Sequence, residues 1–105
     1  LGALCQPAEE ILLGPTNSIR VPVLFVMGDQ DSLNCGPTGS DCSSAAALRA
    51  AEAPYWRGSP CFTVSMVENA GHDINLHIGG DAWFDVADQW LSSLEPRPGG
   101  GLDCG

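Results

Sequence analysis

The sequence has no lysine and only four arginines against thirteen acidic residues, so its formal net charge is −9 at pH 7. Nucleic-acid-binding proteins neutralise phosphates with basic side chains, which this chain has in short supply. An anionic membrane surface would repel so acidic a chain. No apolar run approaches the roughly 20 residues that span a bilayer. We therefore expect no nucleic-acid partner and no membrane partner.

The five cysteines form no Cys-x-x-Cys pair, and neither histidine stands at zinc-finger spacing from two of them. Structural zinc is therefore disfavoured, and disulfides formed in an oxidising compartment are the better interpretation. Cys35 and Cys42 bracket a short turn-rich loop, so we predict a disulfide between them; the alternative is two free thiols. The odd total leaves one cysteine unpaired, or paired outside this sequence. We expect a secreted or extracytoplasmic protein.

The chain also lacks an initiating methionine, a basic start and a signal-like apolar segment at Leu1. These absences are typical of a mature product, a processed piece or a fragment of something longer. The 105 residues are enough for one domain.

An unbroken apolar run, Val23–Met27, ends abruptly at Gly28 and two carboxylates, Asp29 and Asp31. A strand that is apolar on successive residues has both faces covered, as in a parallel sheet lined by helices. Open α/β sheets bind their ligands just beyond the carboxyl ends of such strands. The run therefore predicts a buried parallel strand with a candidate site at its end.

The rest of the chain alternates between helical and strand patterns. An alternating strand follows at 61–67, and Asp41 or Ser43 is the expected cap of the helix before it. The expected fold class is α/β: two parallel strands with flanking helices, incomplete as a stand-alone domain because a buried strand needs a neighbour on each side. The expected helices cover residues 7–13, 43–53 and 81–94, and residues 96–105 are expected to form a Pro/Gly-rich flexible tail.

The run from Val21 to Asp31, followed after a helix and a strand by Glu68-Asn69-Ala70-Gly71-His72, resembles the C-terminal part of the α/β-hydrolase family. In that family the catalytic acid follows a late strand in a Gly-x-x-Asp setting, matched here by Gly28 and Asp31. The histidine follows the last strand, often as Gly-His, and a final helix comes after it. The resemblance implies that residues 1–95 are the C-terminal segment of one hydrolase domain, with residues 1–14 as the end of a cap region.

The resemblance implies that Asp31 orients His72 and that His72 acts as general base and then general acid. Loops at one edge of the sheet would bring the two side chains within hydrogen-bonding reach. Asp29 is the rival acid, and a turn aspartate and a loop histidine are the structural alternatives for the pair. His77 and Asn75 either line the mouth of the site or are polar loop residues.

The sequence departs from the family at the nucleophile, because no serine stands in a Gly-x-Ser-x-Gly elbow and the oxyanion-hole loop is absent. The resemblance therefore implies hydrolysis of a small carboxylic ester or thioester, with the nucleophile supplied by the N-terminal portion of the same hydrolase or by a companion chain. His72, Asp73 and His77 are a weak metal pattern, so we expect no metal and no cofactor.

Two other interpretations remain open. A non-catalytic, disulfide-stabilised, secreted acidic binding module accounts for the cysteines and the charge. It does not account for the buried strand that ends at Gly-x-x-Asp or for the later Gly-His. An inactive truncated hydrolase accounts for the missing nucleophile.

Overall fold

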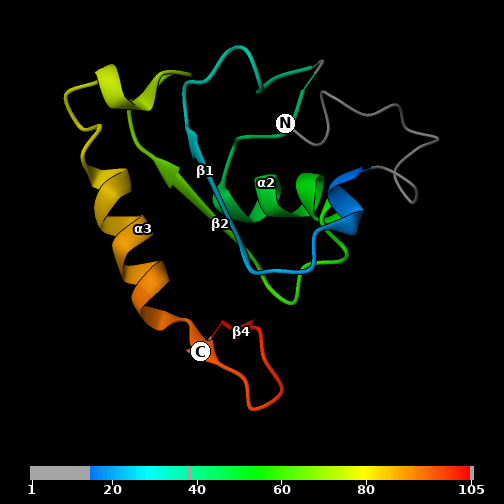
Figure 1. Ribbon diagram of the computed structural model, residues 1–105. Coiled ribbons are helices and arrows are strands. Elements are labelled where there is room, and N and C mark those ends of the chain that lie inside the picture. Colours follow the sequence, from blue (N-terminus) through cyan, green and yellow to red (C-terminus); the bar gives the residue numbers. More distant parts are fainter. Residues whose placement is uncertain (1–14, 38, 105) are drawn as a thin grey trace.

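The computed structural model describes residues 15–37 and 39–104, which form a small mixed α/β domain (Figure 1). The helix expected over residues 7–13, the expected end of a cap region and Cys5 lie outside the described residues. In chain order the elements are η2 (Pro15–Ser18), β1 (Val23–Gly28), α2 (Ala45–Glu52), η3 (Ala53–Tyr55), β2 (Phe62–Val67), η4 (Ile74–Leu76), α3 (Ala82–Ser93), β3 (Glu95–Pro96) and β4 (Leu102–Asp103).

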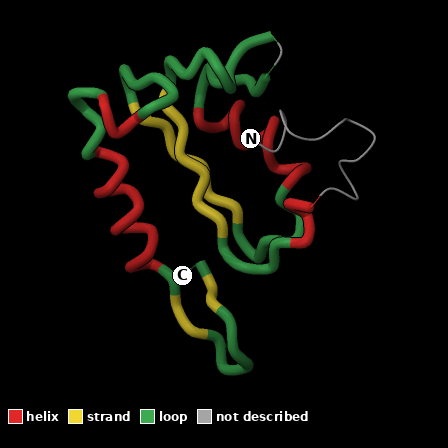
Figure 2. Tube along the Cα trace, turned by 45° about the horizontal axis from the view of Figure 1, so that its top comes forward, coloured by secondary structure: helices red, strands yellow, loops and turns green. Residues whose placement is uncertain are grey.

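The two predicted strands, β1 and β2, pair in parallel and lie side by side in both views (Figures 1 and 2). The register runs from Val23 opposite Phe62 to Gly28 opposite Val67. Pro22 stands just before β1, where its missing N–H breaks no ladder hydrogen bond. Both ends of each strand lie within one residue of the prediction, and the expected α/β class with two parallel strands and flanking helices is confirmed.

Both predicted helices form, each slightly shorter than expected. The cap of α2 is Ser44 rather than Asp41 or Ser43, because the Ser44 hydroxyl accepts the Ala47 N–H at 3.0 Å. The Asp41 carboxylate instead accepts the Ser43 N–H and closes the turn before the helix. Helix α2 therefore begins where a side chain can satisfy one of its free N–H groups.

The helices lie on opposite sides of the strand pair (Figures 1 and 2). Alternate side chains of a strand point to opposite faces, so Phe25 and Phe62 meet Trp56 on the side of α2. Leu48 of α2 is fully buried on this side. On the other side, Trp90 of α3 donates its indole N–H to the Thr63 hydroxyl at 3.3 Å.

The strands are less buried than the apolar run predicts. Residues 23–26 are half-buried, although the sequence favours a strand covered on both faces. Within the described residues β2 is the only strand beside β1, so the other edge of β1 has no strand partner. Helix α3 has no fully buried residue, and its Phe84 and Leu91 are exposed. The prediction of a fully buried strand is therefore wrong, and the reason is the size of the sheet: two strands leave their own side chains, and the helix face packed on them, only partly covered.

The C-terminal segment contains a short antiparallel hairpin, β3–β4, where the sequence predicts a flexible tail (Figure 2). An ion pair between Arg97 and Asp103 at 3.0 Å joins its two arms. A disulfide between Cys61 and Cys104 ties it to the start of β2. The disulfide partner Cys61 is 43 residues away in sequence, so the local Pro and Gly content does not indicate this constraint. No helix in residues 15–37 or 39–104 is long and apolar enough to cross a membrane.

Gly28, the last residue of β1, is packed against the backbone of the loop that follows β2. A side-chain methyl group there would overlap the Ala70 carbonyl, which accepts the Gln30 N–H at 2.9 Å. We expect Gly28→Ala to lower the free energy of unfolding, measured by urea titration, by about 1–3 kcal/mol because the site is overpacked. Gly79→Ala is the control, since a methyl group at Gly79 meets open space. Equal stability of the two variants would contradict this packing.

Candidate active site

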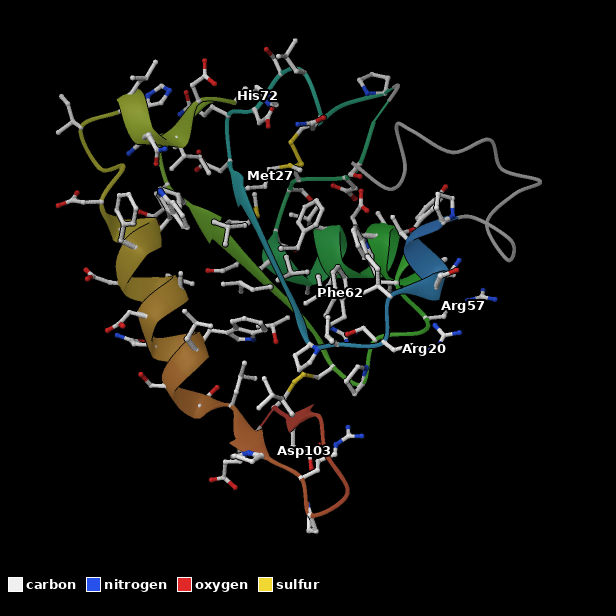
Figure 3. All side chains as sticks on the ribbon, in the orientation of Figure 1. Arg20, Met27, Arg57, Phe62, His72 and Asp103 are labelled. Carbon is white, nitrogen blue, oxygen red and sulfur yellow. A yellow bond between two sulfur atoms is a disulfide. The ribbon has the colours of Figure 1, made fainter. Side chains whose placement is uncertain are left out.

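Asp31 and His72 meet beyond the carboxyl ends of the two parallel strands. Asp31 follows β1 and His72 follows β2, and parallel strands bring these two loops to the same edge of the sheet. The His72 Nδ1 lies 3.0 Å from the Asp31 Oδ2. Figure 3 shows His72 at that end of the strands. The two residues proposed from the sequence are thus within hydrogen-bonding distance.

The turn after β1 holds the Asp31 carboxylate in place. The Asp31 N–H donates to the Gly28 carbonyl at 3.2 Å. Oδ1 accepts the backbone N–H groups of Leu33 and Asn34, each at 3.0 Å, and Oδ2 accepts the Asn34 side-chain amide at 3.0 Å. Such a turn, in which an aspartate side chain accepts hydrogen bonds from the backbone that follows it, orients the carboxylate independently of His72.

Asp31 is only 3% exposed. Burial alone would raise the pKa of its carboxyl, but hydrogen bonds from His72, from the Asn34 side chain and from the Asn34 and Leu33 backbone lower that pKa below its ordinary value. The Asp31 carboxyl is therefore ionised at neutral pH.

An ionised carboxylate only accepts hydrogen bonds, so the proton between Asp31 and His72 belongs to the His72 Nδ1. The Asn34 amide nitrogen lies 3.0 Å from the same Nδ1, and both nitrogens donate to the Oδ2 of Asp31. In the neutral imidazole the lone pair is then on Nε2. The His72 side chain is 45% exposed, and within the described residues nothing hydrogen-bonds to Nε2. This nitrogen is free to take a proton.

The loop that carries His72 is itself held from both sides. The Gln30 N–H binds the Ala70 carbonyl, and the His77 Nε2 accepts the Gly71 N–H at 3.0 Å. His77 thus supports the backbone next to His72 and does not line the cavity described below. Of the two alternatives for His77, the structure favours the polar loop residue. Asn75 accepts the Trp83 indole N–H. Polar contacts within residues 69–83 and with Gln30 therefore hold this loop.

A cavity of about 600 Å³ opens beside His72. Its walls come from one face of β1, from the loop after β2 and from the start of α3. The lining is mostly apolar with three polar side chains, as in many ligand sites. The lining residues are Leu24, Val26, His72, Asp73, Ile74, Asn75, Leu76 and Trp83.

Asp29, the rival acid, is exposed, and its N–H donates to the Val67 carbonyl at 3.0 Å. It lines a second hollow with the Cys35–Cys42 loop rather than the cavity at His72. Among the described residues, Asp31 is the carboxylate that contacts His72. The structure therefore distinguishes the two candidates by geometry.

No serine, threonine or cysteine of the described residues hydrogen-bonds to His72 or lines its cavity. The same residues contain no group of three or more His, Cys, Asp or Glu side chains that could hold a metal ion. The arrangement can therefore orient a histidine base, but the described part of the chain brings no nucleophile to it.

Sequence reasoning missed Asn34 and predicted one of the two disulfides. The signal for Asn34 is its place three residues after Asp31, the spacing at which an aspartate turn binds a backbone N–H. The predicted Cys35–Cys42 disulfide is present, with 5.6 Å between its Cα atoms. The Cys61–Cys104 disulfide was not predicted.

Neither the family models nor the curated proteins compared with this chain match it. The interpretation of the site therefore depends on the geometry of Asp31, Asn34 and His72.

The lowered pKa of Asp31 makes the stability of the protein depend on pH. Because that pKa is lower in the folded protein than in the unfolded chain, ionised Asp31 stabilises the fold above about pH 4. The contribution is lost as pH falls through the folded pKa. We expect Asp31→Asn to lower the free energy of unfolding at neutral pH by about 1–3 kcal/mol.

The deficit of Asp31→Asn should shrink as the pH falls below about 4, because the wild-type carboxyl is then protonated as well. Urea titrations at a series of pH values measure it. The control is Asp29→Asn, which changes an exposed neighbouring carboxylate. A deficit for Asp31→Asn that does not vary with pH would contradict the assignment.

Proposed function

We propose that this chain is the C-terminal part of an α/β-hydrolase-type serine hydrolase that cleaves carboxylic esters or thioesters. The observation that carries the proposal is the hydrogen bond between the His72 Nδ1 and the Asp31 Oδ2, made at the carboxyl ends of parallel strands with Nε2 left free. This is the arrangement of acid and base in a Ser-His-Asp triad. The Gly-x-x-Asp and Gly-His settings of the two residues add to it.

In the proposed reaction the His72 Nε2 takes the proton of a serine hydroxyl as the oxygen attacks the carbonyl carbon of the substrate. Asp31 stabilises the imidazolium that forms but does not take its proton. The imidazolium then gives the proton to the departing alkoxide or thiolate, which leaves an acyl-enzyme. Water, deprotonated by the same Nε2, releases the acid and regenerates the serine.

The nucleophile in this proposal comes from polypeptide outside the 105 residues, either the N-terminal portion of the same hydrolase or a companion chain. Two observations support a missing partner of that kind. Within the described residues one edge of β1 has no strand beside it. Several large apolar side chains are also exposed, among them Leu76, Ile78, Phe84 and Leu91. Exposed strand edges and apolar patches are typical of surfaces that another polypeptide covers.

The proposal places the enzyme outside the cytoplasm, because two disulfides join described cysteines and disulfides persist in oxidising compartments. The same disulfides and the net charge of −9 favour a second candidate, a secreted acidic binding module without catalytic activity. That candidate gives no role to the buried, ionised Asp31 or to the free Nε2 of His72. We therefore prefer the hydrolase.

The test uses a fluorophosphonate probe and a chromogenic ester, on this chain alone and on the chain joined to the polypeptide that precedes it in its gene. We expect labelling only in the longer protein, at a serine outside these residues. In the longer protein Asp31→Asn should reduce ester turnover by about 10⁴-fold, because the wrong imidazole tautomer is then favoured. His72→Gln should reduce turnover at least as much.

Asp29→Asn is the matched control and should keep its turnover, since Asp29 does not contact His72. Labelling of this chain alone would contradict a nucleophile from outside. Turnover that survives His72→Gln would contradict the triad. Absence of labelling and turnover in the longer protein would favour the binding module or an inactive truncated hydrolase.

A further inference from the structure

The loop closed by the Cys35–Cys42 disulfide follows directly after the turn that holds Asp31. The disulfide joins its two ends, and inside it the Gly36 N–H donates to the Ser40 carbonyl at 3.1 Å. The Met27 Sδ, at the end of β1, lies 3.3 Å from both cysteine sulfurs. The two cysteines of the loop are therefore packed against the strand that leads to Asp31.

Asn34 joins this loop to the candidate active site. It is buried, with 6% of its surface exposed. Its backbone N–H and side-chain amide donate to the two oxygens of Asp31, each at 3.0 Å. Its carbonyl accepts the Ser40 N–H at 2.8 Å, from within the disulfide loop. Asn34 is thus bonded to the catalytic carboxylate on one side and to the loop on the other.

The loop is anchored in turn to α2 by a buried acid that the proposed reaction does not use. Ser40, 2% exposed, donates its hydroxyl to Glu52 at 2.6 Å, and Glu52 is fully buried on α2. The other carboxylate oxygen of Glu52 accepts the Trp56 indole N–H at 3.3 Å. Burying a carboxyl group is costly unless it is hydrogen-bonded. The burial of Glu52 therefore favours the arrangement in which Ser40 and Trp56 both donate to it. A hydrogen-bonded chain therefore connects α2 through Ser40 and Asn34 to Asp31.

We infer that Asn34 is a positioning residue for the Asp31–His72 pair, held in place by the Cys35–Cys42 loop and its Ser40–Glu52 anchor. That the pair is positioned for catalysis rests on the proposed function. The hydrogen-bonded connection from the loop through Asn34 to Asp31 is a property of the folded chain itself. Without the Asn34 amide, Oδ2 keeps only His72 as its donor, and the carboxylate is held in its orientation only by His72 and by the two backbone N–H groups at Oδ1.

The test follows the Asp31 carboxyl by ¹³C NMR during a pH titration, together with the His72 Nδ1 proton. The groups that hydrogen-bond to the carboxylate are His72 from the loop after β2, and Leu33 and Asn34 from its own loop. We expect Asn34→Ala to raise the pKa of Asp31 toward its ordinary value and to speed solvent exchange of the Nδ1 proton. Ser32→Ala, an exposed change in the same turn, is the control and should alter neither.

The disulfide is tested by the double variant Cys35→Ser, Cys42→Ser, which should shift both signals in the same direction as Asn34→Ala. The matched control is Cys61→Ser, Cys104→Ser. It removes the other disulfide, which ties the hairpin to the start of β2 at the end of the strands away from His72. The control should leave both signals where they are. Ser40→Ala, which keeps the disulfide, should give a smaller shift of the same sign.

An Asn34→Ala protein that matches Ser32→Ala in both signals would overturn the inference, and so would equal effects of the two disulfide variants. In the longer, active protein Asn34→Ala should lower kcat with KM nearly unchanged. If the coupling is found but no form of the protein hydrolyses esters, the proposed function fails while the positioning role of Asn34 stands.

Discussion

The candidate site depends above all on one hydrogen bond, between the buried Asp31 carboxylate and the His72 imidazole. A carboxylate is stable when buried only if donors surround it, and here the backbone of the turn, Asn34 and His72 supply them. The parallel pairing of β1 and β2 is what brings these groups together, because it places the two loops at one edge of the sheet. The parallel strand pairing therefore forms the candidate site as well as the sheet.

Local patterns were enough to predict the two parallel strands and the two longer helices, but not the β3–β4 hairpin. The pairing of Asp31 with His72 was expected from their places after the two strands and from the family resemblance. The apolar run and the alternating strand predicted β1 and β2, and Pro54 and Pro96 marked the ends of α2 and α3. The short loop between Cys35 and Cys42 indicated their disulfide. Tertiary contacts were not predictable in the same way. Glu52 is buried in an otherwise Ala-rich helix because Ser40 and Trp56 reach it from outside that helix.

The weak burial of the strands and the lack of a nucleophile beside His72 among the described residues have a common explanation in the proposed function. Polypeptide that pairs with the free edge of β1 would cover the half-buried residues 23–26 and would bring a serine to the edge of the sheet where His72 lies. The described residues hold Asp31 and His72 in place through their own contacts, without such a partner. The disulfide loop and Asn34 add rigidity on the side of Asp31.

The protonation state of His72 tests this interpretation most directly. A two-dimensional ¹⁵N–¹H NMR spectrum of the chain at a pH where the ring is neutral distinguishes the two imidazole tautomers. We expect the proton on Nδ1, bonded to Asp31, with Nε2 unprotonated. A ring protonated on Nε2, or one that exchanges freely between the two forms, would contradict a histidine oriented by Asp31 to act as a base.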